Sequence, residues 1–258
     1  MKYELIKKSS TSKARAGILH TKHGSIKTPA FMPVGTQGTV KALTPDMLND
    51  IGAEIILGNT YHLALRPGAD LIAEMGGLHD FISWQKPILT DSGGYQVFSL
   101  SDTNKITSDG VTFRSHLDGS KILFTPEKVI DLQRSFGSDI MMPLDICSPY
   151  PCDKERLEKD ISITHKWAAS AKEYWEKNTN GQLLFGIIQG GMHEDLREKS
   201  AKALTNIEFP GYAIGGLSVG EPRELMEKFV SFTTDFMPED KPRYLMGVGL
   251  PENLEHAI

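Results

Sequence analysis

Residues 88–97 have the sequence ILTDSGGYQV, an apolar run that ends in a carboxylate and a pair of glycines. Ile88 and Leu89 are typical of the end of a buried strand, and glycines allow backbone N–H groups to turn toward a neighbouring group. Asp91 therefore either faces a functional site or caps the segment that follows the turn. The other stretches of the chain decide between these two interpretations.

The same order of an apolar run, a polar or glycine-rich turn and a helical stretch repeats along the chain. Two helical stretches begin with Thr followed by Pro, at residues 44–45 and 125–126, which is a signature of a helix start. Residues 192–204 and 222–229 have the amphipathic pattern of further helices. The seven strand-length apolar runs are residues 29–34, 54–57, 87–90, 140–144, 183–188, 212–214 and 243–246.

Continuous βα repetition with buried, non-alternating strands predicts a parallel sheet. Seven units without a change of character favour a (β/α)₈ TIM barrel over a doubly wound sheet, with the eighth strand absent from this chain. Alternating segments in residues 1–27 predict an antiparallel hairpin lid, and residues 111–123 predict an inserted β-hairpin with an Asp118-Gly119 turn. We expect residues 1–258 to form one α/β domain, an incomplete barrel.

The composition excludes several classes of protein. The 258 residues, 40% hydrophobic and 24% charged, contain no apolar run long enough for a membrane span and no signal peptide, so we expect a cytoplasmic protein. The net charge of -5 means that any nucleic-acid contact depends on a local patch or on shape. Cys147 and Cys152 lack the spacing of a zinc knuckle, and His62 is interpreted as a capping or core residue, so no metal site is predicted in this chain.

Polar or glycine residues follow successive predicted strands: Asp91, Asp145, Gln189 and then glycine-rich turns. In a (β/α)₈ barrel the carboxyl ends of all strands meet at the face that holds the active site. Two carboxylates, a primary amide and exposed backbone groups suit a flat hydrogen-bonding heterocycle such as a purine. Asp145 can accept N–H bonds and Gln189 can donate to a carbonyl, which leaves Asp91 free for proton transfer or nucleophilic attack at the bond between base and sugar.

Seven stretches spread over the whole chain are specific enough to indicate a family. They are residues 32–36, 55–63, 89–97, 115–119, 190–191, 215–221 and 244–249. Together they resemble the queuine tRNA-ribosyltransferases, also called tRNA-guanine transglycosylases. The resemblance implies a homodimeric (β/α)₈ pentosyltransferase on the queuosine pathway. Such an enzyme replaces guanine at the wobble position of GUN anticodons by a 7-deazaguanine, through a covalent tRNA–enzyme intermediate.

The resemblance also implies roles for individual residues. Asp91 becomes the general acid/base, and the pocket must receive a base extruded from the anticodon loop. The residues assigned to the base pocket are Asp91, Ser92, Gly93, Gly94, Tyr95, Asp145, Gln189, Gly216, Leu217 and Met246. The residues assigned to tRNA contact are Gly247, Val248, Gly249, Leu250, Pro251, Glu252 and Asn253.

The chain departs from the family pattern after residues 250–254. The family continues into an eighth strand with a nucleophilic Asp and then a zinc site of three Cys and one His, none of which occurs here. Zinc is therefore expected from the family, but its ligands are absent from this chain. We expect the 258-residue chain alone to be inactive and to form no covalent tRNA adduct.

Two further points remain open. Cys147 and Val219 resemble the bacterial pattern, which predicts 7-aminomethyl-7-deazaguanine as the incoming base, because a bulkier substituent needs the volume of the Val219 side chain. The alternatives to the transglycosylase are a non-catalytic RNA-binding subunit or inactive fragment of this family, and a barrel glycosidase that acts on free nucleosides. The combination of Asp91, Asp145 and Gln189 favours the enzyme.

Overall fold

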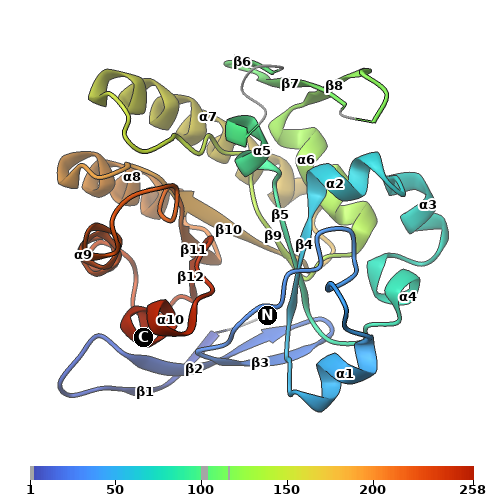
Figure 1. Cartoon of the computed structure of the whole chain (residues 1–258), viewed down its shortest axis with the longest axis horizontal. Coiled ribbons are helices and arrows are strands. Elements are labelled where there is room, and N and C mark those ends of the chain that lie inside the picture. Colours follow the sequence, from blue (N-terminus) through green and yellow to red (C-terminus); the bar gives the residue numbers. More distant parts are fainter. Residues whose placement is uncertain (1–2, 100–103, 116) are drawn as a thin grey trace.

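The computed structural model describes residues 3–99, 104–115 and 117–258, so His116 of the 115–119 motif lies outside the described residues. Its centre is a curled parallel sheet in which every strand pairs with its neighbour in the sequence (Figure 1). The strands are β4 (Ile56–Asn59), β5 (Ile88–Asp91), β9 (Ile140–Met141), β10 (Leu183–Ile188), β11 (Gly211–Ile214) and β12 (Arg243–Leu245). Sequential parallel order with helices outside is the arrangement of a partial (β/α)₈ barrel, which confirms the predicted fold class.

The run predicted as the first barrel strand, residues 29–34, forms a single bridge instead of a strand. Val34 pairs in parallel with Leu57, where the Leu57 N–H donates to the Pro33 carbonyl at 3.0 Å. Pro29 and Pro33 have no N–H to donate, so a regular ladder cannot extend along this segment. The segment still lies beside β4, which is the position of the first strand of the barrel.

The helices lie around the sheet (Figure 1). As predicted, α1 (Pro45–Asp50) and α6 (Pro126–Phe136) begin after threonine caps, whose hydroxyls accept the N–H of Met47 and Lys128 at 3.3 and 3.2 Å. The others are α2 (Thr60–Leu65), α3 (Ala69–Glu74), α4 (Leu78–Ile82), α5 (Gly94–Ser99), α7 (Lys154–Asn178), α8 (Glu194–Ile207), α9 (Arg223–Thr234) and α10 (Pro251–Ala257). In the described part of the chain, no helix is long and apolar enough to cross a membrane.

The long helix α7 was not among the predicted helices. Its buried face contains Thr164 and Lys172 between apolar residues such as Ile161 and Trp167. These polar residues interrupt the apolar stripe by which an amphipathic helix is found in a sequence. Lys172 stays on this face because its amine pairs with Glu176 one turn further along.

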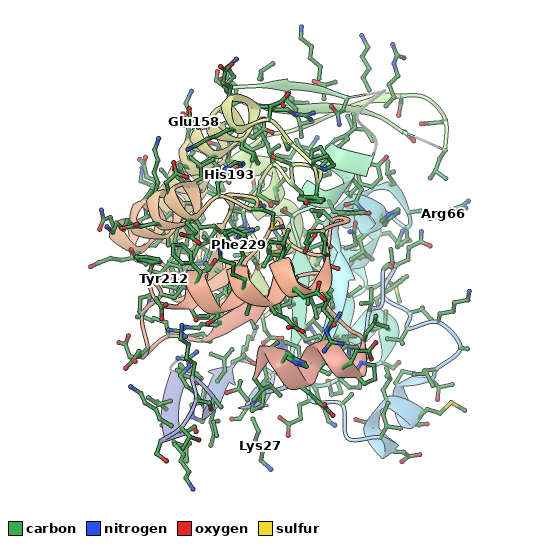
Figure 2. The ribbon with its side chains drawn as sticks, turned by 60° about the vertical axis from the view of Figure 1, so that its left-hand side comes forward. Lys27, Arg66, Glu158, His193, Tyr212 and Phe229 are labelled. Atoms are coloured by element: carbon green, nitrogen blue, oxygen red, sulfur yellow. The ribbon has the colours of Figure 1, made fainter. Side chains whose placement is uncertain are left out.

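Most charged side chains lie at the surface and apolar side chains lie between the sheet and the helices, as expected for a barrel surrounded by helices. In Figure 2 the labelled side chains of Lys27, Arg66 and Glu158 lie at the surface, and all three are exposed. Tyr212 of β11 and Phe229 of α9 are buried in the apolar cluster that joins the sheet to α8 and α9. The outer helices are thus held to the sheet by apolar packing, and the carboxyl ends of the strands are left to carry polar groups.

The N-terminal segment forms three strands, whereas the sequence predicted a hairpin. They are β1 (Tyr3–Lys8), β2 (Arg15–Thr21) and β3 (Gly24–Thr28), paired antiparallel in that order. Leu19 and Ile26 pack on residues near the amino ends of the barrel strands, including Ile140 and Leu183. The sheet therefore covers the end of the barrel opposite Asp91, and the predicted antiparallel hairpin lid is part of this three-stranded cover.

The insertion after β5 also has one strand more than predicted. The expected hairpin corresponds to β7 (Gly110–Arg114) and β8 (Lys121–Phe124), and β6 (Lys105–Thr107) pairs with the free edge of β7. Phe113 and Phe124 pack against Tyr61 of α2, with ring centroids 5.2 and 6.3 Å from the Tyr61 ring. These aromatic contacts attach the insertion near the carboxyl end of β4.

Candidate active site

Asp91 is the last residue of β5, where two neighbouring groups hold its carboxylate. The Gly93 N–H donates to Asp91 Oδ1 at 3.0 Å, and Asn59 Nδ2 donates to Asp91 Oδ2 at 2.9 Å. Asn59 ends β4 and also caps α2, because its Oδ1 accepts the His62 N–H. Burial, which outweighs these hydrogen bonds, raises the pKa of Asp91 to about 7. A carboxyl group with this pKa can both donate and accept a proton near neutral pH.

Asp145 follows β9 and is 4% exposed. It accepts the Ser92 hydroxyl on Oδ1 at 3.1 Å and the Gln189 amide on Oδ2 at 2.8 Å. Burial raises the pKa of Asp145 to about 6, although both hydrogen bonds lower it. The structure thus brings together Ser92, Asp145 and Gln189, which follow three different strands.

Gly94 and Gly216 must be glycines, because the side chains of Asp145 and Gln189 lie too close to them to leave room for a β-carbon. A β-carbon at Gly94 would lie 1.8 Å from Asp145 Oδ1, so a side chain there would displace the carboxylate. Gly216 has a φ of +62°, and a β-carbon there would lie 2.3 Å from Gln189 Oε1. Both positions need glycine, because the backbone forms the wall of the polar site.

The remaining predicted pocket residues follow β5, β11 and β12 in the chain. Leu217 is buried, Met246 is half-buried after β12, and Tyr95 is 54% exposed at the start of α5. In the segment assigned to tRNA contact, residues 247 and 249–252 are exposed, and 248 and 253 are half-buried. This segment therefore presents its main chain and side chains to solvent beside the carboxyl end of β12.

Sequence reasoning missed Asn59, Arg197 and Tyr244. Tyr244 lies on β12, and burial, followed by the charge of Asp91, raises its pKa well above the usual range. Arg197 on α8 is fully buried, with 0% exposure. Its only signal in the sequence is a charged residue among the buried positions of an amphipathic helix, where Leu196 and Ala201 are also buried.

Cys147 is not a nucleophile in this structure. Burial, followed by the charge of Asp145, raises the pKa of its thiol to about 12. The hydrogen bond from the Gly216 N–H lowers this pKa, but by less. A thiol with so high a pKa is neutral at physiological pH. Cys147 and Cys152 are the two cysteines of the chain, so the residues present do not fit a zinc site of three Cys and one His.

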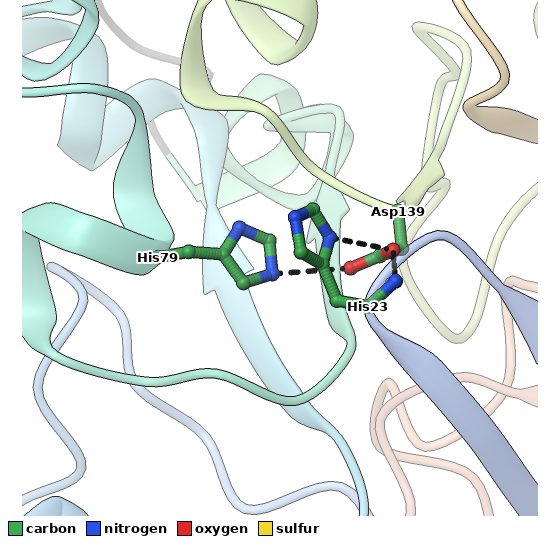
Figure 3. A group of neighbouring side chains, drawn as sticks. All are labelled: His23, His79 and Asp139. Carbon is green, nitrogen blue, oxygen red and sulfur yellow. Dashed lines mark hydrogen bonds and ion pairs between the residues drawn. The ribbon is translucent and has the colours of Figure 1, made fainter.

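Among the described residues, one group of three metal-ligating side chains lies close together: His23, His79 and Asp139 (Figure 3). The Asp139 carboxylate already accepts four hydrogen bonds. They come from His23 Nδ1 at 2.9 Å, the His23 N–H at 3.1 Å, His79 Nε2 at 3.2 Å and the Ile88 N–H at 3.0 Å. The two imidazole rings are stacked at 3.6 Å with an interplanar angle of 26°.

His23 Nδ1 and His79 Nε2 both hydrogen-bond directly to the Asp139 carboxylate, so the three side chains are joined without an ion between them. Burial opposes the charge on Asp139, but the hydrogen bonds from His79, Ile88 and His23 outweigh it and lower the pKa of Asp139. We therefore interpret the group as a clamp that joins the N-terminal sheet, α4 and β9, and we call it the histidine clamp.

A partial (β/α)₈ barrel with a buried and a half-buried carboxyl group, an amide and glycine turns at the carboxyl ends of its strands has the architecture of a barrel enzyme for a small polar substrate. The family described as queuine tRNA-ribosyltransferase matches residues 9–258, and the chain belongs to this family. This confirms the resemblance found in the sequence, and the family supports a transferase that modifies tRNA.

Named relatives cover the whole chain. The queuine tRNA-ribosyltransferase of Caldanaerobacter subterraneus subsp. tengcongensis is 61% identical over 258 residues, which are 100% of this chain and 68% of the relative. The protein of the same name from Thermoanaerobacter pseudethanolicus is 60% identical with the same coverage. That of Ruminiclostridium cellulolyticum is 57% identical over 257 residues, 99% of this chain and 69% of the relative.

Proposed function

We propose that the protein exchanges guanine at the wobble position of tRNAs with a GUN anticodon for 7-aminomethyl-7-deazaguanine. The observation that carries the proposal is the Asp145 carboxylate, buried between Ser92 and Gln189 at the carboxyl ends of the strands. Guanine presents two N–H donors next to a carbonyl, which matches a carboxylate beside an amide donor. Adenine has an acceptor where guanine has its ring N–H, so the same groups would reject it.

Asp91 supplies the proton transfer in this proposal. When the bond between ribose C1′ and guanine N9 breaks, the bonding electrons leave with guanine, and C1′ bonds to the nucleophilic Asp that the resemblance assigns to the eighth strand. N9 of the incoming base then attacks C1′ and displaces that carboxylate. Protonated Asp91 gives its proton to the departing base, and the carboxylate then takes a proton from the incoming base. A non-catalytic RNA-binding subunit would have no use for a carboxyl group whose pKa is raised to about 7 at the strand ends that carry Asp145 and Gln189.

The substrate must reach this site with its base extruded from the anticodon loop. In the proposal, residues 247–253 contact the tRNA backbone and the protein acts in the cytoplasm as a homodimer. The test measures incorporation of tritiated guanine into tRNAs. In a protein that also carries the eighth strand of the family, label should enter tRNAs with a GUN anticodon, and free guanosine should release no guanine. Release of guanine from free guanosine would instead support a nucleoside glycosidase.

Guanine binding should weaken as the pH falls below about 6. Because burial raises the pKa of Asp145 to about 6, the group is a carboxylate above this pH and accepts the donors of guanine. Below it, the protonated group offers an O–H to those donors, and the affinity should fall about tenfold per pH unit. Calorimetric titrations between pH 5 and 8 measure this slope. An affinity that does not change from pH 5 to 7 would contradict the role of Asp145, and Asp145→Asn should remove the dependence.

Val219 should exclude bases with a large substituent. It is half-buried in the turn after β11, where its N–H donates to Glu221 Oε2 at 2.8 Å. Queuine carries a cyclopentenediol that needs the space of the Val219 side chain, and overpacking of this kind costs about 1 to 3 kcal/mol. Val219→Gly should raise the affinity for queuine by about 5- to 150-fold relative to 7-aminomethyl-7-deazaguanine. Equal affinities of the unmodified protein for the two bases would rule out this steric argument.

A further inference from the structure

Arg197 lies behind the polar site and uses all three nitrogens of its guanidinium group. Its hydrogen bonds go to main-chain carbonyls of the two turns that follow β10 and β11. The acceptors are Gly191 at 2.9 Å from Nε, Gly215 at 2.7 Å and Ile188 at 3.4 Å from Nη1, and Gly216 at 3.0 Å from Nη2. One side chain therefore holds two separate glycine-rich turns in a fixed relation.

Burial of the Arg197 guanidinium group costs free energy that a residue with only a packing role would not require. Moving a cation out of water costs several kcal/mol unless partners replace its hydration. Among the described residues, its hydrogen-bond acceptors are carbonyl dipoles, and Glu221 acts on its charge only from a distance. The turn after β10 also packs directly on the backbone of α8, because a β-carbon at Gly190 would lie 2.7 Å from the Arg197 main-chain nitrogen.

The carbonyls that Arg197 binds determine where the next N–H groups point. In a planar trans peptide the C=O and the N–H point in opposite directions. Because the Gly215 carbonyl faces Arg197, the Gly216 N–H points away from Arg197, to the side of the Cys147 thiol. Gln189 joins this turn to Asp145, because a β-carbon at Gly216 would lie 2.3 Å from Gln189 Oε1 and the Gln189 amide donates to Asp145 Oδ2 at 2.8 Å.

The same helix also fixes Gln189. The Gln189 N–H donates to the Ser200 hydroxyl at 3.1 Å, and Ser200 lies three residues after Arg197 on α8. Ser200 Oγ also lies 2.9 Å from His165 Nε2 on α7, so its orientation is set from a second side. Arg197 and Ser200 thus both bind the end of β10. Arg197 donates to the Ile188 carbonyl, and Ser200 accepts the Gln189 N–H.

We infer that Arg197 is a positioning residue of the base-exchange site. Through the Gly215–Gly216 peptide it aims the Gly216 N–H at the carbonyl oxygen of the base. Together with Ser200 it aims the Gln189 amide at the same oxygen. This inference rests on the proposed function. Its buried positive charge also polarises that peptide, so the Gly216 N–H becomes a stronger donor. Negative charge that develops on the base as it departs is stabilised by this donor.

The test measures guanine affinity in Arg197→Lys, which keeps the charge but cannot bind the carbonyls of both turns. Guanine affinity should fall at least about tenfold. The loss should be smaller for 6-thioguanine, whose sulfur is a weaker acceptor of the aimed donors. Arg243→Lys is the matched control, because Arg243 also donates to main-chain carbonyls, those of Met237 and Pro238, at 2.6 and 3.3 Å. Its guanine affinity should stay unchanged.

A second measurement does not depend on the folding of a variant. In ¹⁵N-labelled unmodified protein, the Nε–H signal of Arg197 should shift when guanine binds and stay in place when adenine is added. Unchanged guanine affinity in folded Arg197→Lys, or an unmoved Arg197 signal at guanine saturation, would overturn the inference and leave the proposed function intact. Failure of the unmodified protein to bind guanine at all would overturn both.

Discussion

Replacement of Asp145 by Asn is expected to weaken guanine binding by about 1 to 3 kcal/mol, or roughly 5- to 150-fold. The amide would present its NH₂ group to the N–H donors of the base, and a buried donor would remain unpaired. The surrounding hydrogen bonds from Ser92 and Gln189 show how little space there is for an alternative position of the side chain. Isothermal titration calorimetry of the purified variant with guanine gives the affinity directly.

The matched control for this substitution is Asp131→Asn. Asp131 also accepts hydrogen bonds on both carboxylate oxygens, from the Tyr174 hydroxyl at 3.0 and 2.9 Å, but it lies on the outer helix α6. Its substitution should leave guanine affinity unchanged. If Asp145→Asn bound guanine as tightly as the unmodified protein, Asp145 would not be the group that recognises the base.

The largest loss of stability is expected for Asp139→Ala, about 3 to 5 kcal/mol in the free energy of unfolding. The substitution removes the acceptor of four hydrogen bonds at once and leaves two histidines and two main-chain N–H groups without it. Urea denaturation followed by circular dichroism measures the change. Asp139→Asn should lose less, because the amide oxygen still accepts hydrogen bonds.

The same denaturation experiment separates a histidine clamp from a metal site. Because Asp139 is saturated by donors, a chelator should leave the unfolding midpoint of the unmodified protein unchanged, and added Zn²⁺ should not raise it. The lowered pKa of Asp139 gives the direction of the pH effect. Its contribution to stability is present above the pKa that the group has in the unfolded chain and is lost as the pH falls through the folded value. A midpoint that rises with Zn²⁺ would show that His23 and His79 bind metal.

Local patterns were sufficient to predict most of the barrel. The apolar runs that became β5 and β10, and the Thr-Pro starts of α1 and α6, depend on residues within one element, so they are visible in a sequence. The location of the N-terminal sheet is different. It is fixed by contacts such as that of His23 with Asp139, which lie 116 positions apart in the chain. No local pattern encodes such a contact, so the sequence did not show which end of the barrel the sheet covers.

The candidate site also contains residues that could be predicted from the sequence and some that could not. Asp91, Asp145 and Gln189 were predicted together because the barrel topology brings the carboxyl ends of neighbouring strands to one face. Arg197 could not be found by that rule, because it lies on a helix and its partners include carbonyls 18 and 19 positions away. In the sequence it resembles an ordinary surface arginine, and only its burial shows that it belongs to the site.

The guanine site itself is tested most directly by calorimetric titration of the protein with guanine and with adenine at pH 7.5, which is above the pKa of Asp145. The two purines have nearly the same size and differ in the donors and acceptors on the edge that Asp145 and Gln189 face. Guanine should bind once per chain, and adenine should bind at least about 100-fold more weakly. Equal affinities for the two purines would contradict the assignment of Asp145 and Gln189 as the groups that recognise the base.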